Sequence, residues 1–194
     1  MNNPIFKRCF DISIVCLCLP LILLLSICIF LLVKVTSTGP ALYWSQRVGI
    51  CNQLFNMPKF RSMKIGTPVL ATHIMYQQAN PNQYLTPAGS FIRKTSLDEL
   101  PQLWNVLKGD MSLVGPRPAL FNQDDLVHLR TDQGVHSLKP GITGWAQVNG
   151  RDELPIPQKV ALDAYYLKHQ SLWLDCYIIL LTIFKVLNHD GVSH

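Results

Sequence analysis

Two adjacent carboxylates, Asp98 and Glu99, are the side chains of this sequence whose types and spacing best suit chemistry. Cations lie on both sides of the pair, with Arg93 and Lys94 before it and Arg117 after it. A carboxylate can attack phosphorus or hold a metal ion, and arginine binds phosphate through two parallel N–H bonds. The pattern therefore predicts a site for a phosphate compound. The alternative is that Glu99 only caps a helix and Asp98 is a solvated acid.

A helix should position both acids. Ser96 and Glu99 have the S-x-x-E spacing of a capping box, which predicts a helix that begins here with the acids in its first turn. The backbone dipoles at that end would favour ionised carboxylates. Pro101 fits poorly a full turn inside a helix, so the second option is a helix that begins at Pro101. In both cases the acids lie at the amino end of the helix.

A stiff turn should position Arg117. Gly109 and Asp110 predict the end of the preceding helix. The sequence Gly115-Pro116-Arg117-Pro118 then predicts a rigid turn that presents a single arginine. We expect this turn to fix the direction of the guanidinium group.

Further cations are expected on a β-hairpin. Residues 41–48 and 54–63 contain strand-forming side chains on either side of a Gly-Ile-Cys-Asn turn. Arg47, Lys59 and Arg61 lie on this hairpin and are candidate phosphate contacts. The alternative for each is an ordinary solvated side chain.

A second candidate phosphate-binding segment is the glycine-rich loop from Lys139 to Arg151, which contains Trp145. Such loops can bring backbone amides and a guanidinium group to a phosphate. The alternative is an ordinary turn with a packed tryptophan.

The amino-terminal region contains an apolar run from Ile12 to Val33, long enough to cross a bilayer core that requires about 20 residues. The run is too long for a typical cleaved signal peptide. Pro20 predicts a bend inside it. Basic residues on both flanks favour two cytoplasmic ends, which a re-entrant helix permits; a kinked single span is the alternative.

Composition narrows the classes of partner. The chain has 17 basic and 12 acidic residues, a net charge of +5, which suits contact with anionic lipid or a nucleotide diphosphate. The basic residues are scattered and no nucleic-acid-binding motif is present, so we expect no nucleic-acid partner. The six cysteines form no C-x-x-C pattern and predict neither a zinc site nor a redox site.

These patterns predict an α+β fold: a mainly helical, membrane-associated domain with an amino-terminal membrane helix, either re-entrant or a kinked single span, and a small β-hairpin. We expect residues 1–36 to form the membrane helix and residues 37–194 a cytoplasmic catalytic domain with interfacial helices. Residues 118–137 predict a short helix, and residues 157–187 read as helical with a last apolar segment in the membrane interface or on the core.

Several blocks of the sequence resemble the bacterial sugar transferases, also called monotopic phosphoglycosyl transferases. In order along the chain they are FDI with its apolar run, TSTGPALYWSQRVG, MPKFRSM, TPAGSFIRKTSLDELPQLWNVLKGDMSLVGPRP and KPGITGWAQVNGRDEL. Together they cover nearly the whole chain, and the resemblance implies that the amino-terminal membrane helix is re-entrant, with both ends at one face of the membrane. Two positions depart from the family pattern: Leu19 replaces the serine usual before Pro20, and Pro58 replaces an aromatic residue often found before Lys59.

The resemblance implies a mechanism. A UDP-sugar would bind with Mg²⁺, Asp98 would attack the sugar-bearing phosphorus, and UMP would leave. Polyprenyl (undecaprenyl) phosphate would then displace Asp98 to give polyprenyl diphosphate sugar. Asp98 and Glu99 would be the catalytic residues and metal ligands, and whether Glu99 holds the metal or accepts a proton stays open. The substrate phosphates would be bound by Lys59, Arg61, Arg93, Arg117 and Arg151.

The same resemblance implies a place in the cell, which is the bacterial inner membrane with the catalytic domain on its cytoplasmic face. There the enzyme would begin a surface polysaccharide or glycoconjugate. The sugar is not predicted, and recruitment of downstream glycosyltransferases and formation of a homodimer stay open. Two other functions are considered: a catalytically silent membrane anchor that recruits glycan-assembly enzymes, and a metal-dependent phosphohydrolase with water as the acceptor.

Overall fold

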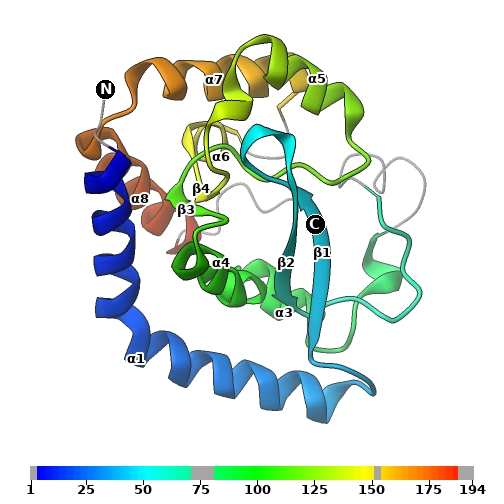
Figure 1. The fold of residues 1–194 in the computed structure, drawn as a ribbon. Helices are drawn as coiled ribbons and strands as arrows, with labels where there is room; N and C mark the ends of the chain where they lie inside the picture. The colour runs from blue at the N-terminus through cyan, green and yellow to red at the C-terminus, as the bar shows by residue number, and fades with distance from the viewer. Residues whose placement is uncertain (1–3, 71–80, 151–153, 188–194) are drawn as a thin grey trace.

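The computed structural model describes residues 4–70, 81–150 and 154–187 of the chain (Figure 1). Its elements are α1 (Pro4–Thr36), β1 (Leu42–Val48), η1 (Ile50–Asn52), β2 (Leu54–Phe60), η2 (Pro81–Tyr84), α3 (Gly89–Lys94), η3 (Leu97–Gln102), α4 (Leu103–Lys108), β3 (Ser112–Val114), α5 (Asp124–Asp132), η4 (Val135–Ser137), β4 (Gly141–Thr143), α6 (Trp145–Val148), α7 (Ile156–His169) and α8 (Leu172–Leu187). This mixture of many helices with short strands agrees with the predicted α+β class.

The apolar run forms the long helix α1, which contains Pro20. Within the described residues it is the one helix long and apolar enough to cross a membrane, judged by length and composition. Figure 1 shows that α1 bends about midway, which confirms the predicted bend. A proline lacks the N–H of the regular ladder and pushes its ring against the preceding turn, so the two halves of the helix diverge.

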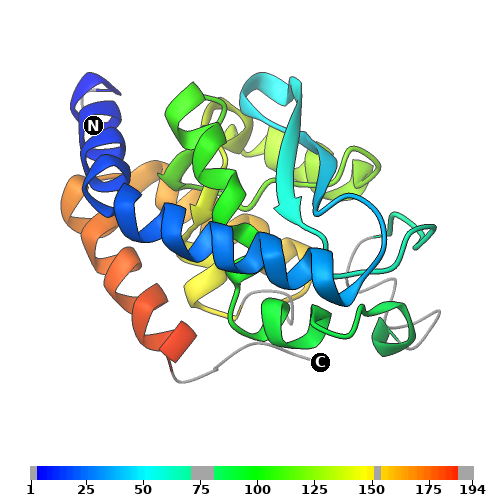
Figure 2. The same cartoon turned by 90° about the horizontal axis from the view of Figure 1, so that it is seen from below.

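The two halves of α1 pack against different parts of the protein. Figures 1 and 2 show the first half beside α8 and the second half beneath α3 and α4. Val15 packs against Met57 of β2 and Val106 of α4, whereas Val33 belongs to a second apolar cluster with Phe60 and Ile92. Most of the other apolar side chains of α1 remain exposed.

The predicted hairpin is confirmed. β1 and β2 pair antiparallel, with Leu42 opposite Phe60 and Val48 opposite Leu54. Met57 and Phe60 lie on opposite faces of β2, and each is buried in a different apolar cluster. This burial holds the hairpin against the helices and fixes where Lys59 can reach.

A parallel pairing of β3 with β4 was not predicted. Ser112 lies opposite Gly141, and Val114 lies opposite Thr143. The backbones approach closely here: a Cβ atom on Gly115 would lie 2.4 Å from the carbonyl oxygen of Lys139. The pairing was missed because strands of three residues carry no alternation that a periodic pattern could reveal.

The helical prediction for residues 157–187 is confirmed in part, because two helices occupy this region. α7 ends at His169, and α8 begins after Ser171, whose hydroxyl accepts a hydrogen bond from the backbone N–H of Leu174 at 3.1 Å. The buried side chains of Tyr166 from α7 and Ile178 from α8 pack against Val114 of β3. The short helix expected between residues 118 and 137 is α5.

Candidate active site

The acid pair lies in the first turn of η3, a 3₁₀ helix that leads directly into α4. The predicted capping box is wrong. Ser96 adopts a left-handed conformation with φ of 55° and its side chain makes no capping hydrogen bond, although its carbonyl oxygen accepts one from the N–H of Glu99 at 3.2 Å. A capping serine is normally extended, so the left-handed backbone aims the hydroxyl elsewhere. The predicted helix stop is confirmed, because Gly109 ends α4 with φ of 103°.

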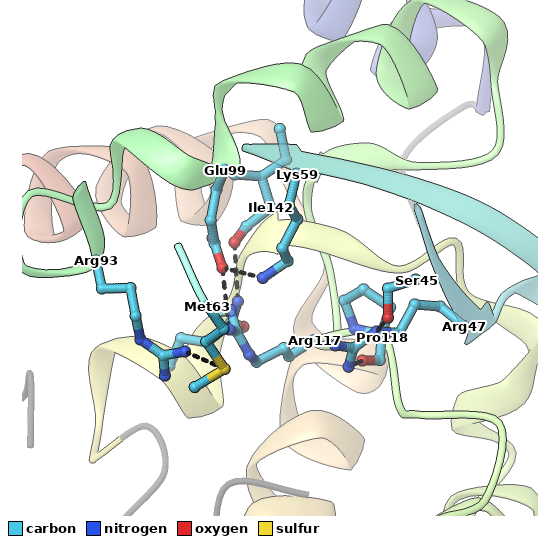
Figure 3. A network of polar contacts seen from close by, with 10 residues as sticks. Ser45, Arg47, Lys59, Met63, Arg93, Glu99, Arg117, Pro118 and Ile142 are labelled. Carbon is cyan, nitrogen blue, oxygen red and sulfur yellow. Dashed lines mark hydrogen bonds and ion pairs between the residues drawn. The ribbon is translucent and has the colours of Figure 1, made fainter. Parts of the chain in front are cut away.

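Glu99 lies at the centre of the candidate site (Figure 3). Its Oε1 atom is 2.9 Å from Nζ of Lys59 and 3.0 Å from Nη2 of Arg117. These three side chains come from η3, from β2 and from the turn after β3, which are far apart in the sequence. The structure therefore brings together one carboxylate and two cations that the sequence offered separately.

Asp98 lies beside this ion-paired group in a buried position, with 9% of the residue exposed. Burial raises the pKa of its carboxyl above the ordinary 3.8. The positive charge of Lys59 opposes that rise, the negative charge of Glu99 adds to it, and Arg93 and Arg117 oppose it more weakly. Burial therefore has the largest effect on the ionisation of Asp98, and the neighbouring cations reduce that effect.

Lys59 shows the reciprocal effect. Burial lowers the pKa of its ammonium group below the usual 10.5, while the negative charges of Glu99 and Asp98 oppose the fall. When all five groups are ionised, the cations Lys59, Arg93 and Arg117 outnumber the two acids. The site therefore keeps positive charge with which to meet an anionic phosphate.

Arg93 is at the end of α3, where its Nη1 donates a hydrogen bond to the sulfur of Met63 at 3.6 Å (Figure 3). A thioether is a weak acceptor, so this guanidinium can exchange its partner for a phosphate oxygen at little cost.

Arg61 is directed away from this group. Its buried guanidinium donates to the carbonyl oxygens of Ser37 and Thr38 at 3.1 and 2.5 Å and to the hydroxyl of Ser37 at 2.8 Å. These contacts tie the segment after α1 to the end of β2. The phosphate contact of Arg61 stays a prediction. Arg151, the remaining predicted phosphate contact, lies outside the described residues.

The turn that carries Arg117 is held at four successive carbonyl oxygens. Those of Pro116 and Ala119 accept from the N–H groups of Gly141 and Val48 at 2.9 and 3.0 Å. The carbonyl oxygen of Arg117 accepts from Nη1 of Arg130 at 2.8 Å, and that of Pro118 from Nη1 of Arg47 at 3.2 Å.

The predicted rigidity of this turn is therefore confirmed, and two arginines contribute to it. Arg47, a predicted phosphate contact, donates hydrogen bonds to the carbonyl oxygen of Pro118 and to the hydroxyl of Ser45 (Figure 3). The sequence did not predict a role for Arg130, because no local pattern distinguishes one basic residue of a short helix from another.

A cavity of about 190 Å³ opens beside Glu99 and Arg117. Apolar side chains dominate its wall, to which α8 contributes Thr182, Lys185 and Val186. The full lining is Ser96, Glu99, Leu100, Leu103, Arg117, Ile142, Thr143, Gln147, Val148, Gly150, Thr182, Lys185 and Val186. The cavity thus joins a charged site to the apolar helix α8.

The two acids fit a magnesium site of the substrate-bridged kind. Mg²⁺ prefers oxygen ligands and is often held by one or two carboxylates together with substrate phosphates. In the part of the chain that the structure describes, no group of three or more His, Cys, Asp or Glu side chains converges to hold a metal. Asp98 and Glu99 are therefore the candidate ligands, and the substrate would have to complete the coordination.

Comparison with known proteins identifies the family. The family model of the bacterial sugar transferases matches residues 2–189. The chain belongs to this family. The identification confirms the family predicted from the sequence, and it covers both the acid pair and the turn around Arg117.

Individual members of the family are also similar to this chain over most of its length. The chain is 42% identical over 204 residues to the undecaprenyl-phosphate galactose phosphotransferase of Salmonella typhimurium, and 42% identical over 191 residues to the UDP-glucose:undecaprenyl-phosphate glucose-1-phosphate transferase of Escherichia coli. These matches cover 98% and 94% of the chain but only 42% and 40% of the two relatives. An uncharacterized sugar transferase of Bacillus subtilis is 40% identical, with 97% of the chain and 91% of the relative covered.

Proposed function

We propose that the protein transfers a sugar 1-phosphate from a UDP-sugar to polyprenyl phosphate at the cytoplasmic face of the bacterial inner membrane. The observation that carries the proposal is the ion-paired group of Glu99, Lys59 and Arg117, which lies beside the buried Asp98 and opens into an apolar cavity. The names of the relatives, which combine undecaprenyl phosphate with a sugar phosphate, support it.

The first step is an attack by a carboxylate oxygen of Asp98 on the phosphorus that bears the sugar. The bond from that phosphorus to the bridging oxygen breaks, UMP leaves, and an aspartyl-phosphosugar intermediate remains. In the second step a phosphate oxygen of the lipid attacks the same phosphorus, and the bond to Asp98 breaks. Bound Mg²⁺ would neutralise phosphoryl oxygens, held by Asp98 and Glu99 together with the substrate.

The cations of the site make these anionic encounters feasible. Arg117 can bind a phosphate through two N–H bonds, and Lys59 adds a point charge. Glu99 orients both of them, because a single carboxylate oxygen accepts from each at about 3 Å. Such preorganised charge stabilises developing negative charge without reorganisation during the reaction.

The cavity supplies a place for the acceptor lipid. Leu100, Leu103 and Ile142 give it an apolar wall next to Arg117, which suits a phosphate attached to an isoprenoid chain. Exposed apolar side chains of α8, including Ile183 and Phe184, continue this surface outward. We propose that α1 and α8 face the bilayer and that the lipid reaches Arg117 from that side.

A re-entrant arrangement of α1 is proposed because both ends of the helix are tied to the same body. At its start, Lys7 pairs with Asp175 of α8 at 2.9 Å, and Arg8 donates to backbone carbonyls at the end of α4. At its end, Arg61, which directly follows β2, holds Ser37 and Thr38. A straight span would carry these two ends to opposite faces of the bilayer.

The test is release of UMP by detergent-solubilised protein with Mg²⁺ and a panel of UDP-sugars, with and without polyprenyl phosphate. Lipid-dependent release with one sugar would support the transferase and name its donor. Release without lipid would favour a phosphohydrolase. No release with any sugar would favour the silent anchor, and Asp98→Asn serves as the negative control.

A further inference from the structure

We infer that Arg130 and Asp163 form a positioning pair that holds the backbone of Arg117 so that its guanidinium group meets Glu99 and the substrate phosphate. The inference rests on the proposed function, because it assigns these two residues to the geometry of that same site. Neither residue lines the cavity beside Glu99, so they act through Arg117.

The pair lies behind the active site and is buried. Arg130 of α5 and Asp163 of α7 are 8% and 1% exposed. Nε and Nη2 of Arg130 lie 3.0 and 2.7 Å from Oδ2 of Asp163. This arrangement leaves Nη1 of Arg130 to donate to the carbonyl oxygen of Arg117 at 2.8 Å.

The division of the guanidinium between two acceptors argues for a role beyond joining α5 to α7. If Arg130 only joined α5 to α7, its ion pair with Asp163 would be sufficient. The planar guanidinium fixes the angle between its N–H groups, so an arginine held by Asp163 also has a defined direction toward the Arg117 carbonyl. The carboxylate therefore orients the donor, and the donor orients the peptide.

The hydrogen bond from Arg130 to the Arg117 carbonyl also influences the direction of the Arg117 side chain. Arg117 lies between Pro116 and Pro118, and the residue before a proline is restricted to extended conformations. Within that range, the orientation of its carbonyl group determines how the peptide sits. The other end of Arg117 reaches Oε1 of Glu99 at 3.0 Å. A chain of contacts therefore runs from Asp163 through Arg130 and the Arg117 peptide to Glu99.

The diagnostic substitution is Arg130→Lys. Lysine keeps the positive charge beside Asp163 but has one nitrogen, which cannot meet the Asp163 carboxylate and the Arg117 carbonyl with the same two-directional geometry. We expect kcat/KM for lipid-dependent UMP release to fall about 10- to 100-fold, since displacement by about 1 Å can cost that much. Asp163→Asn, which keeps an acceptor oxygen, should have a smaller effect in the same direction.

A double-mutant cycle with Arg117→Ala separates positioning from general stability. If Arg130 acts through Arg117, adding Arg130→Lys to Arg117→Ala should leave kcat/KM within about twofold of the Arg117→Ala value. The matched control is Asp175→Asn, which alters another buried ion pair that does not contact the Arg117 turn. Its effect should be the same in both backgrounds, and thermal unfolding of each variant shows whether it remains folded.

Two results would overturn the positioning pair: native kcat/KM in a folded Arg130→Lys variant, or a loss that is undiminished when Arg117 is already alanine. If Arg130→Lys fails to fold, the same cycle is run with Asp163→Asn. The Kd of UMP, measured without turnover, gives the cycle a second readout. If the wild-type protein releases no UMP, the proposed function is wrong. If the wild-type protein turns over but the effects of Arg130→Lys and Arg117→Ala are additive, only the positioning role of Arg130 and Asp163 is wrong.

Discussion

The cluster around Glu99 and the cluster around Asp175 both bury ion pairs, but they differ in how their charges are matched. In the second cluster, Lys7 lies 2.9 Å from Oδ2 of Asp175 and 3.4 Å from Oδ1 of Asp11. Tyr166 donates to Oδ1 of Asp175 at 2.6 Å, and Ser112 donates to Oδ2 of Asp11 at 2.7 Å. Every oxygen of the two carboxylates therefore has a cation or a hydroxyl beside it.

The cluster around Glu99 is arranged differently. Two of its cations share one carboxylate oxygen, and Arg93 contacts a thioether. Burial also raises the pKa of Asp98, which marks it as an acid in an unfavourable environment for its charge. We interpret the Asp175 cluster as one that stabilises the fold and, under the proposed function, the Glu99 cluster as one that retains charge for a substrate. The following predictions test that difference, beginning with the largest expected effect.

Asp98→Asn should abolish lipid-dependent UMP release while the protein stays folded. The amide cannot attack phosphorus, so the loss should reach about a thousandfold or more. The variant should unfold at the wild-type temperature or slightly above it, because the substitution removes a buried acid whose ionisation is disfavoured. Robust turnover by this variant would eliminate the covalent mechanism.

Asp175→Ala should give the opposite result, with a large loss of stability and little loss of activity in the folded protein. Removing this acid leaves Lys7 with Asp11 alone and leaves the Tyr166 hydroxyl without its carboxylate, at a cost of about 3 kcal/mol in the free energy of unfolding. Thermal unfolding and initial UMP release below the transition measure the two effects. A folded but inactive variant would mean that the Asp175 cluster contributes to the site.

The pH dependence of kcat should show whether Lys59 of the Glu99 cluster controls the ionisation of Asp98. In the proposed mechanism, UMP release requires an ionised Asp98. Because burial raises the pKa of that carboxyl, activity should fall on acidification at a pH above the ordinary 3.8. Lys59 is the largest influence opposing the rise. Lys59→Met should therefore raise the pKa further and move the acid limb of kcat to higher pH. The control is Lys108→Met, which removes a surface lysine. If the acid limb of kcat does not move in Lys59→Met, Lys59 does not control the ionisation of Asp98.

The smallest effect on activity is expected from labelling the two ends of α1. Ile5 and Val35 are 68% and 86% exposed, so a cysteine at either position in a cysteine-free background should retain transfer activity. A membrane-impermeant maleimide should label both from the cytoplasmic side if α1 is re-entrant. Labelling from opposite sides would instead establish a true span.

The sequence determined the features that depend on local chemistry. The acid pair, the cations around it, the stiff turn and the blocks that identify the family could all be read along the chain. The bend of α1 followed from Pro20, and the hairpin followed from a turn between two strand-forming runs, because each depends on the conformational limits of a few neighbouring residues.

Only the tertiary structure decided which of these residues meet. Lys59 and Arg117 reach Glu99, whereas Arg61 turns to the end of α1, although all three are basic residues in matching blocks. Charge at a position does not specify a partner, since the partner lies across the fold.

The supports of the site were also beyond the sequence. The pairing of β3 with β4 and the contact of Arg130 with Asp163 join segments about 30 residues apart, and no local period or motif links them. The capping box failed for the same reason, because packing placed Ser96 in a left-handed conformation that its spacing to Glu99 could not reveal. Local residue types supply the carboxylates and cations of the site. Packing between segments that are distant in the sequence determines which of these groups lie close enough to act together.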